Sequence, residues 1–260
     1  MKVVILAGGF GTRISEESHL RPKPMIEIGK YPILVHIMRI YACQGFNDFV
    51  ICAGYKQQII KEYFANFDMY TNDVTFDFKS GEKKILKAPK FNWKVTVADT
   101  GLTTQTGGRL LRARQYIGAE PFLLTYGDAV GDVDIKSVID HHEKSGKMAT
   151  ISVYNFGQNK GVVDLNKDGS VNAFREKSDL DGDLINIGFM MLEPSVFDRI
   201  GGKETILEKD VLQELAKEGQ LNSYTHHGFW QCMDTMREKE MLEKLDSSGH
   251  APWKIWEKIK

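Results

Sequence analysis

The N-terminal stretch constrains the fold of this chain more than any other. Val3 to Leu6 is an unbroken apolar run. Its lack of alternation predicts a strand buried on both faces, as in a parallel sheet covered by helices. Three glycines follow within residues 8–11, and Thr12 and Arg13 come next. Glycine allows a sharp turn and lets an anion reach backbone N–H groups, and arginine adds a rigid cationic fork. We therefore interpret this loop as a phosphate cradle for a nucleotide.

Other classes of glycine-rich loop fit less well. A turn of this kind also arises for purely steric reasons. A dinucleotide fingerprint would need a third glycine where Ile14 stands, and a Walker A loop would continue with Gly-Lys-Ser/Thr. The loop therefore argues against a generic dehydrogenase and against a P-loop ATPase.

The composition is that of a soluble globular protein. The 260 residues are 42% hydrophobic and 27% charged, and the formal net charge is −1, so no global field favours nucleic acid or an anionic membrane. Cys43, Cys52 and Cys232 are odd in number and lack metal-ligand spacing, which fits reduced thiols. No apolar run approaches the length of a membrane span. We expect a cytoplasmic protein that binds neither nucleic acid nor a membrane.

Helices and strands alternate over the first part of the chain. The apolar pattern predicts a helix over 31–41, a buried strand over 48–53 and a second helix over 57–67. His36 and Arg39 lie off the apolar face of the first helix, and we expect both in solvent. The order predicts an α/β fold, a Rossmann-like, doubly wound, mostly parallel mixed sheet with helices on both faces.

We expect the chain to form a single domain, 1–260, with small β insertions and a C-terminal helical segment. Residues 1–130 would form a nucleotide-binding half and residues 131–235 an acceptor-binding half. Residues 236–260 would form the C-terminal helix and tail. Trp253 and Trp256 in that tail would cover a hydrophobic surface of this chain or of a neighbouring subunit.

Residues 68–100 interrupt the alternation. Two strands are predicted there, over 74–78 and 94–99, and the lysine-rich stretch 79–90 lies between them. We interpret this excursion as a solvated hairpin, in preference to a lid or an assembly surface. A second hairpin is predicted around the Asp168-Gly169 turn.

Two charged residues are placed to meet a ligand. Pro22 and Pro24 flank Lys23 and would hold its backbone in a rigid, extended conformation. A solvated lysine in a turn is also compatible with this sequence. Asp128 follows the buried strand 121–126, at the edge where open α/β sheets place ligands.

A second glycine-rich turn opens the helix 110–117. Thr106 is a candidate cap for this helix. Arg109 opposes the helix dipole, so either an anion or a base edge compensates it, or the side chain is solvated. Further along, Asn186 and Gly188 interrupt the apolar run 184–192, and a polar residue there is either satisfied locally or aimed at a ligand.

Taken in order, seven segments resemble the sugar-1-phosphate nucleotidylyltransferases: LAGGFGTR, RPKPM, TGGRL, YGDAV, REK, NIGF and FWQCMDT. Within that family the likeness is greatest to the bacterial glucose-1-phosphate cytidylyltransferases, and it runs nearly end to end. The resemblance implies transfer of the cytidylyl group of CTP to glucose 1-phosphate. It also implies a Mg²⁺ cofactor, a homo-oligomer and a role in CDP-sugar synthesis for surface polysaccharide.

The resemblance also implies roles for individual residues. Arg13 and Lys23 would be catalytic, Asp128 and Asp234 would bind the metal, and Glu176, Lys177, Asn186 and Gly188 would bind the acceptor. The nucleotide would be held by Leu6, Ala7, Gly8, Gly9, Gly11, Thr12, Arg13, Lys23, Thr106, Gly107, Arg109 and Gly127. The chemistry fits these residue types, because the attacking phosphate oxygen is already anionic and the barrier is mainly charge repulsion and positioning.

The departures from the family pattern lie on the acceptor side. Residues 157–162 stand where the family reads Gly-Arg-Phe-Gly-Ala, Ser178 stands in place of proline, and Ile187 stands in place of glycine. Glucose 1-phosphate is the acceptor we favour. Two alternative acceptors stay open, a different sugar phosphate and another small phosphorylated metabolite. An alternative function also stays open, that of a catalytically silent CTP-binding regulatory module.

Overall fold

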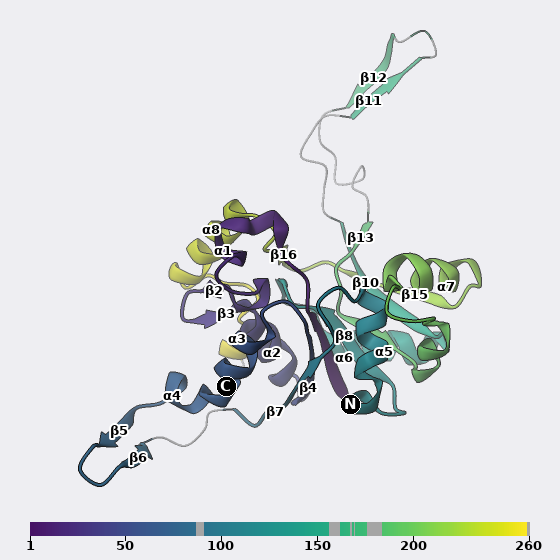
Figure 1. Cartoon of the computed structure of the whole chain (residues 1–260). Coiled ribbons are helices and arrows are strands. Elements are labelled where there is room, and N and C mark those ends of the chain that lie inside the picture. The colour runs from purple at the N-terminus through teal and green to yellow at the C-terminus, as the bar shows by residue number, and fades with distance from the viewer. Residues whose placement is uncertain (87–90, 156–161, 167, 169, 176–183, 259–260) are drawn as a thin grey trace.

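The computed structural model describes residues 1–86, 91–155, 162–166, 168, 170–175 and 184–258. Their centre is a mixed sheet of eight strands, shown in Figure 1. The strands are β1 (Lys2–Ala7), β4 (Asp48–Ala53), β7 (Lys94–Asp99), β8 (Phe122–Tyr126), β10 (Ala149–Asn155), β13 (Leu184–Asn186), β14 (Met190–Leu192) and β15 (Leu221–His226).

Most neighbouring strands of this sheet run parallel. β1 lies between β4 and β8 and is parallel to both, and β7 follows β4 in parallel at the end of the sheet. β10 and β15 also pair in parallel, whereas β13 and β14 run antiparallel to β10, and β14 runs antiparallel to β8. The predicted Rossmann-like, mostly parallel mixed sheet is confirmed.

The side chains of β1 are buried on both faces of the sheet. Val3 and Ile5 belong to one core cluster, and Val4 and Leu6 belong to another. The first cluster includes residues of α2 (Ile33–Ala42), α6 (Ile135–Ser145) and α8 (Met236–Ser247). The second includes residues of α5 (Thr106–Ile117), η3 (Pro194–Arg199) and the π-helix η4 (Leu207–Leu212). The apolar run in the sequence is therefore unbroken because helices cover both sides of this strand.

The remaining helices are short. They are η1 (Thr12–Ile14), α1 (Ser15–Ser18), η2 (Lys23–Met25), α3 (Gln57–Ala65), α4 (Phe67–Thr71), α7 (Gln213–Lys217) and η5 (Ile255–Glu257). In the part of the chain that the structure describes, we find no helix with the length and apolar character needed to cross a membrane.

Four two-stranded sheets lie outside the main sheet. They pair β2 (Glu27–Ile28) with β3 (Tyr31–Pro32), β5 (Val74–Asp77) with β6 (Glu82–Ile85), β9 (Ala129–Gly131) with β16 (Trp230–Cys232), and β11 (Val162–Leu165) with β12 (Val171–Arg175). Both predicted hairpins are thus present, as β5–β6 and β11–β12. The segment 94–99 differs from the expectation of one excursion over 68–100, because it is β7 and pairs with β4 along its whole length.

The prediction that His36 is solvated was wrong, and Arg39 is half-buried rather than fully in solvent. His36 is only 1% exposed. Its Nε2 lies 3.0 Å from the carbonyl oxygen of Ile28, and Trp253 Nε1 donates to its Nδ1 at 3.2 Å. The Arg39 guanidinium lies 4.1 Å from the ring centroid of Trp256. The C-terminal tail therefore covers a second face of α2, and no local sequence pattern predicts this contact. Trp253 packs in the core of its own chain.

Candidate active site

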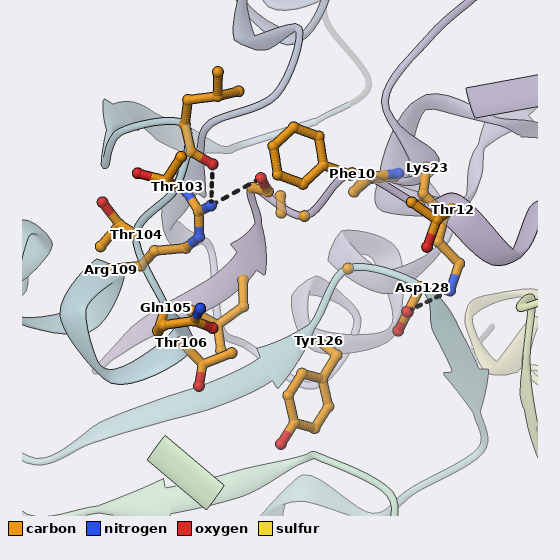
Figure 2. A pocket seen from close by; sticks show the side chains of 18 of the residues that line it. Phe10, Thr12, Lys23, Thr103, Thr104, Gln105, Thr106, Arg109, Tyr126 and Asp128 are labelled. Atoms are coloured by element: carbon orange, nitrogen blue, oxygen red, sulfur yellow. Dashed lines mark hydrogen bonds and ion pairs between the residues drawn. The ribbon is translucent and has the colours of Figure 1, made fainter. Parts of the chain in front are cut away.

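A pocket opens where the parallel strands β1, β7 and β8 end. Its volume is about 360 Å³, and Figure 2 shows its side chains from close by. The described lining residues are Leu6, Ala7, Gly8, Gly9, Phe10, Gly11, Thr12, Arg13, Lys23, Pro24, Leu102, Thr103, Thr104, Gln105, Thr106, Arg109, Tyr126, Gly127 and Asp128. The carboxyl edge of an open α/β sheet is where such folds bind ligands. Of the predicted nucleotide-binding residues, all but Gly107 line this pocket.

The glycine-rich loop follows β1 directly and forms one wall. Gly11 has a φ of 66°, a left-handed conformation that favours glycine, and it begins the short helix η1. A Cβ at Gly8 would lie 2.1 Å from Arg109 Nη1, so a larger residue there would displace that guanidinium. The turn therefore combines a steric requirement with an open wall that a phosphate can approach.

Arg109 clamps this loop to the loop after β7. Its Nη2 donates to the carbonyl oxygens of Gly8 at 2.9 Å and Leu102 at 3.2 Å, and its Nη1 donates to Thr100 Oγ1 and to the Gly101 carbonyl. Figure 2 shows two of these bonds. Backbone carbonyls thus compensate the cation that the sequence places at the start of α5. Burial lowers the pKa of Arg109 from its usual high value.

Thr106 does not cap α5, contrary to expectation. Gln105 is the N-cap residue, and no side-chain cap is formed. The Thr106 hydroxyl is used elsewhere, because it donates to Glu208 Oε2 at 2.7 Å and accepts from the amide of Leu207 at 2.9 Å. Gly107 faces Thr205 through its amide rather than the pocket.

Lys23 is held as the prolines predict, and the alternative of a solvated lysine is excluded. Pro22 adopts an extended conformation, and Lys23 and Pro24 begin the short helix η2. Lys23 is 7% exposed. Its ammonium donates to Asp128 Oδ2 at 2.7 Å and also to Asp234 Oδ1. The cation thus lies between the two predicted metal ligands.

The second carboxylate arrives from the far end of the chain. β16 pairs with β9, and the amide of Met233 bonds the carbonyl of Asp128 at 2.8 Å, so Asp234 comes beside Asp128. Thr235 and Glu238 then form a capping box at the start of α8, and Glu238 Oε2 accepts from the amide of Asp234 at 2.7 Å. Asp234 is therefore fixed by a sheet on one side and a helix cap on the other.

The charges of this group offset one another. Burial alone would lower the pKa of Lys23, but the charges and hydrogen bonds of Asp128 and Asp234 outweigh burial and raise the pKa above its usual value. Arg13 adds a second cation, with Nη1 2.6 Å from Asp234 Oδ2, and its side chain is 72% exposed. Both cations lie next to the glycine-rich loop.

Two adjacent carboxylates fit a Mg²⁺ ion better than a cation that needs a complete protein cage. Mg²⁺ binds through one or two carboxylates together with substrate phosphates and water. Asp128 and Asp234 provide that number, and no group of three or more His, Cys, Asp or Glu suited to a metal occurs among the described residues.

The acceptor side is only partly described. Glu176 and Lys177 lie outside the described residues. Asn186 Nδ2 lies 3.4 Å from the hydroxyl of Tyr126, and the amide of Gly188 donates to Asn186 Oδ1 at 3.0 Å. Gly188 has a φ of 77°, and a Cβ there would press against Tyr126. Both predicted acceptor residues that the structure describes thus adjoin a residue of the pocket wall.

Several residues of this neighbourhood were not predicted from the sequence, among them Tyr126, Glu208 and Glu238. Tyr126 lines the pocket, and Glu208 bonds both Tyr126 and Thr106 from behind. Glu238 fixes the backbone at Asp234. The Thr-x-x-Glu pattern at 235–238 could have revealed Glu238 as part of a capping box. No local pattern marks Glu208, because its partners lie 102 and 82 residues away.

Comparison with known proteins shows the family of this chain. The family model described as nucleotidyl transferase matches residues 2–237. The chain is 48% identical to a glucose-1-phosphate cytidylyltransferase of Salmonella typhimurium, over 99% of this chain and 100% of that protein. It is 42% identical to a probable glucose-1-phosphate cytidylyltransferase of Bacillus subtilis, over 98% of this chain and all of that protein. Its fold matches the crystal structure of HddC from Yersinia pseudotuberculosis with a TM-score of 0.68 at 23% identity, covering 94% and 98% of the two chains. The chain therefore belongs to the nucleotidyl transferase family.

Proposed function

We propose that this protein transfers the cytidylyl group of CTP to α-D-glucose 1-phosphate, forming CDP-glucose and pyrophosphate. The observation that carries the proposal is the buried Lys23 ammonium, held between Asp128 and Asp234 beside the glycine-rich loop. The choice of cytidine and glucose is supported by the names of the Salmonella and Bacillus relatives, to which the chain is 48% and 42% identical over almost its full length.

The residues of the pocket suit this reaction. An oxygen of the acceptor phosphate attacks the α-phosphorus of CTP, a new P–O bond forms, and the bond to the departing pyrophosphate breaks. The attacking oxygen is already anionic, so the site needs positioning and positive charge rather than a general base. Lys23 and Arg13 supply that charge to the phosphates. Asp128 and Asp234 would hold a Mg²⁺ ion, which adds positive charge at the phosphates when bound.

The remaining residues would orient the two substrates. The backbone of residues 6–12 and Gly127 would cradle the nucleotide, and Arg109 would hold that loop in shape through the carbonyl of Gly8. Asn186 and Gly188, with Glu176 and Lys177, would bind the glucose phosphate. We also expect a cytoplasmic homo-oligomer that binds neither nucleic acid nor a membrane and supplies CDP-sugar for surface polysaccharide. Size-exclusion chromatography with light scattering would measure the oligomeric state.

A matrix of nucleotides and acceptors tests the proposal. Pyrophosphate release would be measured for CTP, UTP, dTTP, GTP and ATP, each with glucose 1-phosphate, mannose 1-phosphate and a set of small phosphorylated metabolites. We expect the highest kcat/KM for CTP with glucose 1-phosphate. A clear preference for another acceptor would show that glucose 1-phosphate is not the substrate and would make that compound the acceptor. CTP binding in a calorimeter without pyrophosphate release for any acceptor would indicate a regulatory module.

A further inference from the structure

Glu208 joins two walls of the pocket. Its Oε2 accepts a hydrogen bond from the Thr106 hydroxyl and its Oε1 accepts one from the Tyr126 hydroxyl, each at 2.7 Å. Thr106 and Tyr126 both line the pocket, and Glu208 is not among the lining residues that the structure describes. In Figure 2 the two hydroxyls point to the same side, away from Phe10 and the glycine-rich loop. One carboxylate behind the pocket thus serves two side chains within it.

The backbone that carries Glu208 is firmly attached to α5. The amide of Gln105 donates to the Lys203 carbonyl at 2.9 Å, and the amide of Gly107 donates to the Thr205 carbonyl at 3.0 Å. A Cβ at Gly107 would lie 2.9 Å from Thr205 O, and a Cβ at Gly108 would lie 2.5 Å from Lys203 O. The two glycines of the second turn therefore allow the segment 203–208 to approach the helix start. Glu208 itself lies in a π-helix, a feature frequent at functional sites.

The direction of each hydrogen bond is fixed. The amide of Leu207 donates to Thr106 Oγ1 at 2.9 Å, so the Thr106 proton is directed at Glu208. Burial and the neighbouring Glu208 carboxylate raise the pKa of Tyr126 above its usual value, so its hydroxyl keeps its proton and donates. Asn186 Nδ2 in turn faces the Tyr126 oxygen at 3.4 Å. A continuous chain of polar contacts thus runs from Thr106 through Glu208 and Tyr126 to Asn186.

We propose that Glu208 is a positioning residue that holds the nucleotide wall at Thr106 and the acceptor wall at Tyr126 and Asn186 in a fixed relation. The inference rests on the proposed function, in which CTP contacts Thr106 and the sugar phosphate contacts Asn186. A carboxylate suits this role because both of its oxygens accept. Glutamine of the same size would present an NH₂ group to one of the two hydroxyl donors. That clash would displace the side chain that holds both walls, so both walls would have to shift. In-line transfer is sensitive to such shifts.

Three single variants separate positioning from general stability. Glu208→Gln disturbs both walls. Thr106→Val removes the donor to Oε2 together with the acceptor of the Leu207 amide. Tyr126→Phe removes the donor to Oε1 together with the acceptor that faces Asn186. We expect Glu208→Gln to raise the KM values for CTP and for glucose 1-phosphate by about tenfold each, as for one lost hydrogen bond to a charged group. Thr106→Val should raise the KM for CTP alone, and Tyr126→Phe the KM for the sugar phosphate alone. Thr106→Val combined with Glu208→Gln should be no worse for CTP than Glu208→Gln, because coupled residues are not additive.

The matched control is Glu204→Gln, an exposed glutamate of the same segment whose ion pair with Lys203 is in solvent. It should leave both KM values and the melting temperature unchanged. The inference is overturned if folded Glu208→Gln retains wild-type KM values, or if only one of them rises. If Glu208→Gln does not fold, the selective effects of Thr106→Val and Tyr126→Phe test the inference. It is overturned if each of these two variants raises both KM values, or if neither variant raises either KM value.

Failure of the proposed function would be visible separately. If the wild-type protein releases no pyrophosphate from CTP and glucose 1-phosphate, the proposed reaction is wrong, whatever Glu208 does. CTP affinity is then measured by calorimetry without an acceptor. Glu208→Gln and Thr106→Val should still weaken CTP binding, while Tyr126→Phe should not. Wild-type CTP affinity in all three variants would overturn the positioning role of Glu208 on the nucleotide side.

Discussion

Lys23 Nζ lies 2.7 Å from Asp128 Oδ2, although 105 residues separate them along the chain. The same ammonium bonds Asp234, which is 211 residues away. Because Lys23 is 7% exposed, its ammonium is strongly desolvated, and the two carboxylates offset the cost of that burial. The pair of prolines, the end of β8 and the β9–β16 sheet thus meet around one cation beside the glycine-rich loop.

Loss of Lys23 should impair turnover severely. We expect Lys23→Met to lower kcat by a factor on the order of 10²–10³, the size of effect seen when one preorganised charge is removed from a transition state. Pyrophosphate release would measure it. Lys30→Met, at an exposed lysine a few residues on, is the control and should have full activity. Wild-type kcat in Lys23→Met would refute the catalytic role of Lys23.

The two aspartates should govern dependence on the metal ion. EDTA should abolish activity, and added Mg²⁺ should restore it, because a carboxylate pair needs the ion to offset phosphate charge. Asp128→Asn and Asp234→Asn should each require a higher Mg²⁺ concentration for half-maximal rate. Mn²⁺ binding to the free protein, followed by electron paramagnetic resonance, should weaken in both variants. Asp198→Asn, at an exposed aspartate of η3, should titrate like the wild type. Unchanged metal titrations in both site variants would exclude these residues as ligands.

Arg109 should affect nucleotide affinity through the shape of the loop. Arg109→Lys keeps the charge but cannot reach the carbonyls of Gly8 and Gly101 together, because lysine lacks the planar fork. We expect the KM for CTP to rise about tenfold, with little change in the KM for the acceptor. Arg112→Lys, at an exposed arginine of the same helix, is the matched control. A normal KM for CTP in Arg109→Lys would show that the clamp is dispensable.

His36 should make the stability of the protein sensitive to acid. Burial lowers the pKa of His36 from 6.5 to about 4. The unfolded chain therefore takes up a proton at a higher pH than the folded one, and the contribution of His36 is complete above pH 6.5 and is lost as the pH falls toward 4. The loss amounts to roughly 3 kcal/mol across that window.

Urea unfolding from pH 7.5 to 4.5 would measure this dependence. In His36→Gln the free energy of unfolding should fall less steeply over the same range, whatever its absolute value at pH 7.5. His250→Gln, at an exposed histidine near the end of α8, should follow the wild-type curve. Parallel curves for His36→Gln and the wild type would contradict the buried, neutral state of His36.

The sequence by itself determined the class of fold, and it predicted a phosphate site at the end of the first strand. The run Val3 to Leu6 predicted a strand buried on both faces, and the glycines, Thr12, Arg13 and the clamped Lys23 pointed to a phosphate site at its end. These features are local, since strand burial and proline restraint act over a few residues. The order of motifs then indicated the family, which the match over residues 2–237 confirmed.

Only the tertiary structure decided which residues act together. Thr106 and Arg109 precede the predicted helix 110–117. The Thr106 hydroxyl bonds Glu208, and the Arg109 guanidinium bonds backbone carbonyls of the loops after β1 and β7, so the place of each residue beside the helix did not predict its partner. His36 is buried because Trp253 reaches it across 217 residues. Such contacts depend on how the sheet brings remote segments together, and no periodicity in the sequence records that. The same reason explains why Asp234 was recognised by resemblance, whereas its place beside Lys23 and Asp128 follows from the pairing of β16 with β9.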